Sequence, residues 1–296
     1  MSSALQQYLL AAHSPNTQKA YRNDVKHFMR WGGRIPSSAK KVAQYLAYYG
    51  KSLSVATLAR RVTAIHQAHQ HQGLPSPTKS ALVKETLQGI RRIHGSEQRR
   101  VLPLLHSELD AWAVKQKGIR GLRDTALLLV GFAGAFRRSE LVSIQVKQVH
   151  FVKQGMLIHL PRSKTDTAGI GRDIAIPFAS NRNSCAVRAL RKWLTIAAIA
   201  EGMVFRRVNR YGQVLGQGLS NQSVALVVKR CVMELGLKSA DYSGHSLRAG
   251  LVTSAALAGV DVWKIRQQTG HQSDAMLQRY IRDSQLFSDH LLHQLH

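Results

Sequence analysis

Apolar residues recur at intervals of three and four positions along the first 94 residues, which is the pattern of amphipathic helices. The first helix is predicted to open at Ser14-Pro15, where serine can cap and proline suits an early helical position, and to stop at Gly32-Gly33. Three more helices are predicted at about residues 38–49, 54–73 and 78–93. Four helices within about 90 residues predict a compact all-α domain.

The pattern changes after residue 103. Residues 95–103 are polar and basic and contain a closing proline, which predicts a linker between a first domain at 1–94 and a second at 104–296. The second domain combines helical periods with short strand-like runs, so the expected fold class is mainly α with a small antiparallel sheet. Its helices are predicted at 107–116, 121–132, 135–141, 184–200 and 220–235, its strands at 149–152, 156–160 and 173–177, and a loop at 202–218. Gly131 and Gly134 are predicted to break the helix at 121–132.

Two short helices are predicted next, beginning at the stretch Ser-Gly-His-Ser-Leu-Arg. A helix that opens at Ser243 would place His245 and Arg248, which are three residues apart, on one face. Gly259 is predicted to stop this helix and Asp261 to cap the following one.

A third short helix is expected to bring Tyr280 back over the first. The second helix is predicted to end near Gly270, directly before His271. Two imidazoles, a guanidinium and a phenol would then surround one point. A guanidinium matches two phosphate oxygens, imidazoles handle protons, and a phenol is a nucleophile once positive charge favours its ionised form. The combination predicts phosphoryl transfer through a tyrosyl intermediate, although each residue alone is more often an ordinary structural residue.

Charge indicates the partner. The chain has 42 Lys+Arg and 16 Asp+Glu, for a net charge of +26, which indicates a polyanion as its usual companion. At 44% hydrophobic residues it can bury real cores. Cys185 and Cys231 form no CxxC pair, which argues against a zinc cage or a disulfide framework. No leading apolar segment or run near 18 residues is present, so we expect no membrane and a cytoplasmic location.

Residues 1–100 carry 16 Lys+Arg and 3 Asp+Glu, and the other 196 residues carry 26 and 13, so both parts have a net charge of +13. Net positive charge is therefore about twice as dense in the first domain, which suggests contact with the DNA backbone. The candidate DNA contacts lie on the third helix, in the linker and in the loop at 202–218: Arg60, Arg61, His66, Arg99, Arg100, Arg206 and Arg207. For any one of them a solvated face is an equally good interpretation. His66, His69 and His71 could also suggest a metal site, but no cysteine or carboxylate supports one.

Two further candidates lie in the first half of the second domain. Arg137 and Glu140 are three residues apart on a short predicted helix, so the carboxylate could direct the guanidinium. The alternative is an ordinary surface ion pair. Lys164 lies in the polar loop between the second and third predicted strands, where it is either a solvated charge or an acid delivered to a leaving oxygen.

The whole chain resembles the tyrosine recombinases. Their catalytic set is matched in order and approximate spacing by Arg137 with Glu140, Lys164, His245-x-x-Arg248, His271 and Tyr280. The phrases Ser-Gly-His-Ser-x-Arg, Arg-Ser-Lys-Thr and Tyr-Ile-Arg look closest to the Cre branch. Ala135 departs from the family, which often has glycine ahead of the first arginine, and His271 replaces the tryptophan of Cre. The resemblance implies an all-α SAM-like core-binding domain followed by a mixed α+β catalytic domain.

The resemblance also implies a role for each residue. Arg137 and Arg248 would clamp the scissile phosphate, and His271 would donate a further hydrogen bond to it. Tyr280 would attack to give a 3′-phosphotyrosyl enzyme, Lys164 would protonate the 5′ leaving oxygen, and His245 would assist proton movement at the nucleophile. Glu140 would support Arg137 from behind. No metal and no other cofactor is expected.

The implied partners are double-stranded DNA target sites and further copies of the chain, as a homotetramer on DNA and a monomer without it. The tail from Ile281 to His296 has apolar residues at helical spacing and would dock on a neighbouring subunit. Packing on its own domain is the alternative. A DNA-bound recombinase would be nucleoid-associated.

Two other functions compete with site-specific recombination. A type IB topoisomerase forms the same 3′ linkage but works alone, and a DNA-binding protein without catalysis needs no intact catalytic set. The tail after Tyr280, the separate basic domain and the complete ordered set favour the recombinase. The sequence predicts neither the DNA site nor whether the outcome is integration, excision, inversion or resolution.

Overall fold

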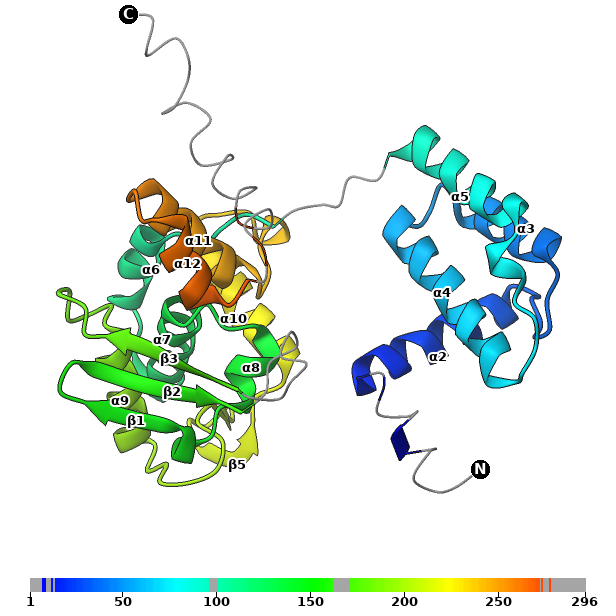
Figure 1. Ribbon diagram of the computed structural model, residues 1–296. Coiled ribbons are helices and arrows are strands. Elements are labelled where there is room, and N and C mark those ends of the chain that lie inside the picture. The colour runs from blue at the N-terminus through cyan, green and yellow to red at the C-terminus, as the bar shows by residue number, and fades with distance from the viewer. Residues whose placement is uncertain are drawn as a thin grey trace, which may run out of the picture. The chain divides into compact units, whose positions relative to one another are not determined.

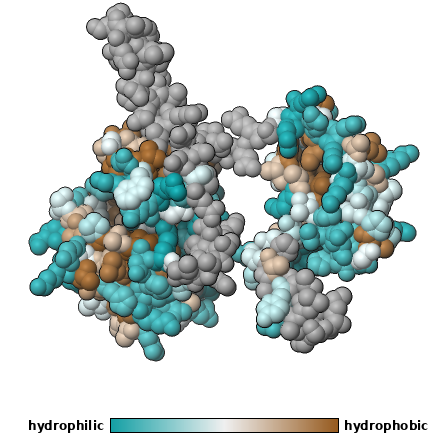
Figure 2. All heavy atoms as spheres, viewed as in Figure 1, coloured by the Kyte–Doolittle hydropathy of each residue, from teal (hydrophilic) through white to brown (hydrophobic). Residues whose placement is uncertain are grey.

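The computed structural model describes residues 7–8, 12, 14–95, 101–161, 171–271, 273 and 277. The chain divides into two compact units, Met1–Arg99 and Arg100–His296. Figure 1 shows the first unit as a group of helices and the second as helices with a sheet. Hydrophilic side chains cover much of the visible face of each unit (Figure 2).

The helices of the first unit begin at serines, three of them at the serines that the sequence predicted. They are α2 (Pro15–Arg30), α3 (Ala39–Tyr49), α4 (Val55–His71) and α5 (Ala81–His94), with a 3₁₀ turn η1 (Pro77–Lys79) before α5. The side chains of Ser14, Ser38, Ser54 and Ser80 each accept a hydrogen bond from a backbone N–H in the first turn. The last helix starts three residues later than predicted because Ser80, after the 3₁₀ turn, is its cap.

The core of the first unit is formed by the predicted apolar stripes. Phe28, Leu46, Leu58 and Ile65 are fully buried in it. Gly33 lies against the ring of Phe28, where an added Cβ would come within 2.4 Å of a ring carbon. The glycine that ends the first helix therefore also permits a close contact that no other residue would allow.

The second unit contains a three-stranded antiparallel sheet. Its strands are β1 (Val149–Val152), β2 (Gly155–Leu160) and β3 (Arg172–Pro177), in the order β1-β2-β3. Leu160 pairs with Arg172 and Gly155 with Pro177. Ile158, Ile174 and Ile176 are buried while their neighbours along the strands are exposed, so one face of the sheet packs on the core.

Helices cover that face and complete the unit. They are α6 (His106–Ala113), α7 (Gly118–Ala133), α8 (Arg138–Ser143), α9 (Ala186–Ile196), α10 (Asn221–Glu234), α11 (Ser246–Leu257) and α12 (Val262–Thr269), with 3₁₀ turns η2 (Val146–Gln148) and η3 (Ser239–Asp241). Figure 1 shows α7 and α9 behind the sheet, and residues of all three share one buried cluster. The mainly helical fold class with a small antiparallel sheet is therefore confirmed.

Two local predictions were wrong. The stretch 202–218 is not only a loop, because it contains the hairpin β4 (Arg206–Val208) and β5 (Val214–Gly218). Its turn is closed by Asn209, whose side chain accepts from the backbone of Gln213 at 3.0 Å. Gly131 does not break α7 but lies inside it, where an added Cβ would come within 2.8 Å of Leu141 and 2.9 Å of Leu247. It is a packing residue that lets α8 and α11 approach.

Across the described ranges, no helix combines the length and the apolar character needed to cross a membrane.

Candidate active site

Arg137 is held by the first turn of the short helix α8. It occupies the N-cap position, and Glu140 is the third residue of the helix. Glu140 Oε2 accepts from the Arg137 backbone N at 2.9 Å, and its Oε1 accepts from Arg137 Nη1 at 2.6 Å. The Glu140 side chain is only 6% exposed and that of Arg137 19%, so the pair is not an ordinary surface contact. Glu140 thus directs the Arg137 guanidinium, as the spacing predicted, and the same carboxylate also caps the helix.

Arg248 reaches the same region from α11. Its side chain is buried, and its Nη1 donates to the carbonyl oxygen of Ala135 at 2.7 Å. Ala135 has a φ of +48°, in the left-handed region that glycine adopts without strain. The left-handed turn after α7 directs the carbonyl of Ala135 toward Arg248. Arg137, the N-cap of α8, follows two residues later. This explains why glycine suits the position and shows that alanine is accommodated in the same geometry.

His245 differs from Arg248 in its surroundings. It is the N-cap residue of α11, so the helix opens three residues later than predicted, and its side chain is exposed. The turn before it is closed by two serines: Ser246 Oγ accepts from the Ser243 backbone N at 3.0 Å, and Ser243 Oγ accepts from the His245 backbone N at 3.1 Å. These two hydrogen bonds fix the backbone that carries the exposed His245 side chain.

His271 follows the left-handed residue Gly270, which ends α12 as predicted. Its Nδ1 lies 2.6 Å from Thr269 Oγ1, and that oxygen lies 2.7 Å from the carbonyl of Ile265. A carbonyl only accepts, so the single hydroxyl hydrogen of Thr269 goes to Ile265 and Nδ1 of His271 is the donor to Thr269. The neutral ring then carries its hydrogen on Nδ1 and has a lone pair on Nε2.

The pKa of His271 is lowered from 6.5 to about 4. Burial is the main cause, and positive charge on Arg248, Arg137 and Arg172 adds to it. The contacts agree with this, although the three arginines lie at α11, α8 and β3. Arg248 is bonded to Ala135, two residues before Arg137, and Arg172 packs against Gly270, next to His271. The structure thus gathers Arg137, Arg248 and His271 around one position.

Arg172 was missed by the sequence analysis. It is the first residue of β3, directly after the loop that contains Lys164, and it donates from Nη1 to the carbonyl of Gln268 at 3.2 Å. The only sequence signal was its place directly before the strand predicted at 173–177. Its approach to His271 depends on how β3 packs beside the end of α12.

Lys164 and Tyr280 lie outside the described residues, so their predicted roles stay predictions. Leu277, three positions before Tyr280 in the sequence, is fully buried together with Val252, Ala256 and Ile265. That cluster joins α11 and α12.

The predicted DNA contacts of the first unit differ in exposure. Arg60 has a half-exposed side chain and is bound to Asp24 through two nitrogens, at 2.7 and 3.0 Å. Arg61 is buried, with Nη1 2.8 Å from Tyr45 Oη and 3.0 Å from His27 Nδ1. The expectation that Arg61 faces DNA does not match this position, because α4 turns its guanidinium inward. His66 is partly buried.

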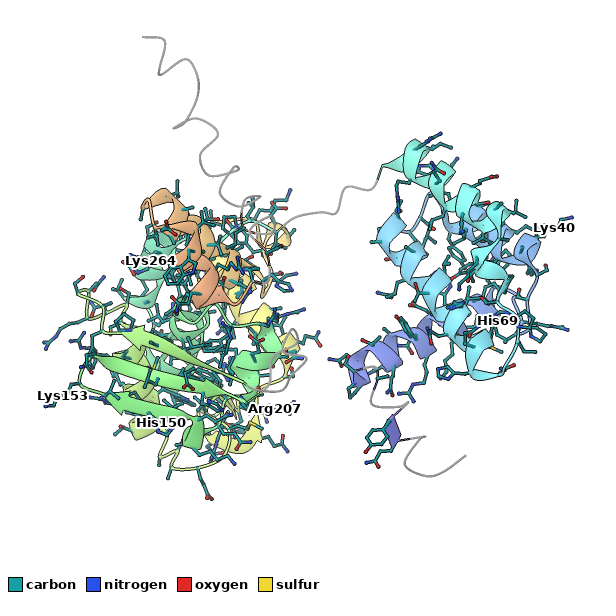
Figure 3. All side chains as sticks on the ribbon, in the orientation of Figure 1. Lys40, His69, His150, Lys153, Arg207 and Lys264 are labelled. Atoms are coloured by element: carbon teal, nitrogen blue, oxygen red, sulfur yellow. The ribbon has the colours of Figure 1, made fainter. Side chains whose placement is uncertain are left out.

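The other candidates lie in the second unit or in the linker. Arg207 is exposed on β4 and is labelled in Figure 3, whereas Arg206 turns back to the carbonyls of Met203 and Glu201. Arg99 and Arg100 lie outside the described residues.

The histidines of α4 do not resemble a metal site. His69, labelled in Figure 3, is fully buried; its Nδ1 donates to the Ile65 carbonyl at 2.8 Å and its Nε2 accepts from the Ser37 backbone at 3.0 Å. Both nitrogens are used to join α4 to the segment before α3. Within the described ranges, no group of three or more histidine, cysteine or acidic residues is arranged to hold a metal ion.

Comparison with known proteins identifies the family. Residues 107–286 match the model of the phage integrase family. The chain is 40% identical over 291 residues to a protein of Selenomonas ruminantium named integrase/recombinase xerD homolog, a match that covers 95% of this chain and 85% of that protein. The chain belongs to the phage integrase family. It is therefore a tyrosine recombinase, the class to which its ordered catalytic motifs pointed.

Two solved structures of other integrases have the same fold as this chain. The Tn1549 transposon integrase in complex with transposon right end DNA has a TM-score of 0.64 at 16% identity, with 96% of each chain covered. A lambda integrase dimer bound to a COC′ core site has a TM-score of 0.63 at 17% identity, with 94% of this chain and 76% of that chain covered. The topoisomerase alternative is not favoured, because these matches are to integrases and recombinases. The particular likeness to Cre stays a prediction.

Proposed function

We propose that this phage integrase is a site-specific DNA recombinase that cleaves and rejoins DNA through a 3′-phosphotyrosyl intermediate. The observation that carries the proposal is the gathering of Arg137, Arg248 and His271 around one position. Buried cations facing each other are costly without a compensating anion. Glu140 supplies one negative charge and is already bound to Arg137, so the arrangement is suited to a phosphate.

In the cleavage step, the phenolic oxygen of Tyr280 attacks the phosphorus and the bond from phosphorus to the 5′ oxygen breaks. The 5′ oxygen takes a proton from Lys164, and the phenolic proton passes to a base for which His245 is the candidate. Rejoining is the reverse: a 5′-hydroxyl attacks the phosphotyrosine, and the tyrosine oxygen regains a proton. The phosphodiester bond is conserved as a phosphotyrosine, so the two steps need no nucleotide hydrolysis.

Arg137 and Arg248 bind the non-bridging oxygens and stabilise the charge that develops on them. Both guanidiniums are directed before substrate arrives, one by Glu140 and one by the Ala135 carbonyl. Preorganised donors of this kind each contribute about 3–4 kcal/mol to lowering the barrier.

His271 acts only after it gains a proton. In the neutral ring Nε2 has no hydrogen to donate, because Thr269 holds the hydrogen on Nδ1. An incoming phosphate offsets the three guanidiniums and raises the proton affinity of the ring. The protonated ring then donates from Nε2 to a phosphate oxygen, which is the role that the family resemblance assigns to it.

The first unit, with residues 1–94 as its helical part, is proposed to bind target DNA, and residues 104–296 to catalyse. Support for DNA binding by the first unit comes from its net positive charge, which is about twice as dense as in the rest of the chain. Arg207, exposed on β4, is a further candidate contact in the second unit. Arg60 is half exposed and is a candidate contact in the first unit. Arg61 has a structural role, because its hydrogen bonds join α4 to Tyr45 of α3 and His27 of α2. Catalysis would take place in the cytoplasm, on DNA of the nucleoid.

The active form is a homotetramer on DNA, in which the tail from Ile281 to His296 docks on a neighbouring subunit. The family's exchange of this segment supports it, as does the apolar spacing of the tail. Deletion of residues 284–296 should leave binding to one site nearly intact and abolish the joining of two sites. Analytical ultracentrifugation on paired-site DNA tests this, and an undiminished tetramer would show that the tail packs within its own subunit.

The test of catalysis uses Tyr280→Phe, which removes one oxygen. The protein is incubated with DNA of its native replicon, and covalent adducts are trapped with denaturant and mapped. We expect wild-type protein to give adducts at defined positions with free 5′-hydroxyl ends, and the variant to bind DNA and give none. Adducts that persist in the variant would refute the assignment of the nucleophile. Plasmids with one site and with two sites then distinguish relaxation from recombination.

A further inference from the structure

Arg172 is a partly buried cation, and no carboxylate among the described residues forms an ion pair with it. The described residues contain no ion pair that includes it, and its single described hydrogen bond runs from Nη1 to the Gln268 carbonyl. Its Nη2 is buried and has no hydrogen-bond partner within that part of the chain. Burial lowers the pKa of Arg172, with Glu140 opposing this effect and Arg137 adding to it. An unsatisfied buried donor on a charged group is unfavourable and indicates a missing partner.

The backbone around Arg172 is shaped to bring it close to His271. Gly270 adopts φ +65°, and a Cβ there would lie 2.6 Å from Arg172 Nη1. The guanidinium therefore packs directly against the turn that ends α12 and presents His271. Its positive charge is one of the causes that lower the His271 pKa, together with Arg248 and Arg137.

A purely structural role accounts for only part of this arrangement. The contact with Gln268 helps to join β3 to α12, but Gln268 already joins α12 to the end of α7 and to β3 through its own amide. The Nε2 of Gln268 lies 2.9 Å from the Ala133 carbonyl and 3.3 Å from that of Ala175. A neutral side chain could make the Nη1 contact without burying a charge. A purely structural role therefore does not explain why Nη2 of Arg172 is buried without a hydrogen-bond partner among the described residues.

We propose that Arg172 is a third phosphate-binding guanidinium, which donates from Nη2 to a non-bridging oxygen of the scissile phosphate beside Arg137 and Arg248. This inference rests on the proposed function and adds a catalytic residue to it. The phosphate supplies the partner that Nη2 lacks and the negative charge that the three arginines share. Arginine suits the position because its planar fork presents separate N–H groups to the Gln268 carbonyl and to the phosphate in fixed directions, whereas a lysine ammonium is a single charge on a flexible stem.

The test compares Arg172→Gln with wild type on two versions of the mapped DNA site. One version has an ordinary scissile phosphate. The other has a methylphosphonate, in which an uncharged methyl group replaces one non-bridging oxygen, prepared as each diastereomer. The rate of covalent adduct formation is measured in a single turnover with the full chain. Removing one donor to a developing charge slows cleavage by roughly a hundredfold. We expect Arg172→Gln to show that loss of rate on the phosphate substrate. On at least one methylphosphonate diastereomer, its rate of adduct formation should lie within about threefold of the wild-type rate.

Arg188→Gln is the matched control. Arg188 also donates from Nη1 to a backbone carbonyl, that of Ala179, at 3.1 Å, but it lies on α9 and does not act on His271. It should cleave both substrates at nearly the wild-type rate. If Arg172→Gln does not fold, as judged by its thermal melt, Arg172→Lys takes its place. It should keep the charge, lose about tenfold on phosphate, and regain that loss on one methylphosphonate diastereomer.

The outcomes separate this inference from the function on which it rests. If wild-type protein cleaves, but Arg172→Gln is slowed by the same factor on the phosphate and on both methylphosphonates, the phosphate contact is overturned and Arg172 is a positioning residue. Unchanged cleavage of the phosphate by Arg172→Gln overturns the inference as well. Absence of any adduct with wild-type protein would overturn the proposed function itself, and the role of Arg172 with it.

Discussion

Thr269 controls which nitrogen of His271 carries the hydrogen, and Thr269→Val tests this directly. Valine keeps the shape of a fully buried side chain but removes the hydroxyl that lies 2.6 Å from Nδ1 and 2.7 Å from the Ile265 carbonyl. Loss of the acceptor leaves a half-buried Nδ1–H without its partner, which costs about 1–3 kcal/mol in the free energy of unfolding. The hydrogen then moves in part to Nε2, since a bias of about 1 kcal/mol corresponds to roughly a fivefold ratio of tautomers.

The measurement is ¹⁵N NMR of the histidine ring nitrogens at neutral pH, with His271→Gln used to assign the signal. We expect the wild-type ring to show a protonated Nδ1 and a bare Nε2. In Thr269→Val the two nitrogens should move toward a mixture. Thr269→Ser is the matched control: it keeps the hydroxyl, so its spectrum should resemble wild type.

A wild-type spectrum with the hydrogen on Nε2 would refute the reasoning, because Thr269 would then donate its hydroxyl hydrogen to Nδ1 of His271 and not to the Ile265 carbonyl. A Thr269→Val spectrum that is identical to wild type would also refute it, since the tautomer would be set by something other than the hydroxyl.

Two other predictions concern protons. The pKa of His271 is about 4 in the folded protein against an ordinary 6.5, so the unfolded state binds more protons between these values and stability must fall as the pH drops from 6.5 toward 4. The difference corresponds to at most about 3.4 kcal/mol, and to about 1–2 kcal/mol once solvent screening of a half-buried ring is allowed for. Denaturant unfolding at pH 7 and pH 4.5 should show a smaller loss of stability in His271→Gln than in wild type, and an equal loss would contradict the assignment. Lys164→Ala should slow cleavage of ordinary DNA and be partly rescued by a substrate whose 5′ bridging oxygen is replaced by sulfur, a better leaving group that needs no acid; no rescue would assign the acid to another residue.

Local sequence determined the elements that depend on neighbours along the chain. The four serine caps and the glycines at 32, 259 and 270 mark helix ends, because capping involves residues within one turn. The pairing of Arg137 with Glu140 was predictable for the same reason, since side chains three residues apart on a helix are adjacent. The ordered set of catalytic residue types was enough to indicate the family.

Tertiary packing decided everything that joins distant segments. Arg61 and Arg60 are adjacent in a basic helix, yet one is buried against Tyr45 and the other is half exposed, because only the packing of α4 on α2 and α3 chooses the inner face. The hairpin of β4 and β5 carried too little apolar pattern to be recognised. Arg172 and Thr269 lie 97 residues apart in sequence and meet at His271 only because β3 packs beside the end of α12. Such contacts depend on the free energy of the whole packed unit, which no local pattern encodes.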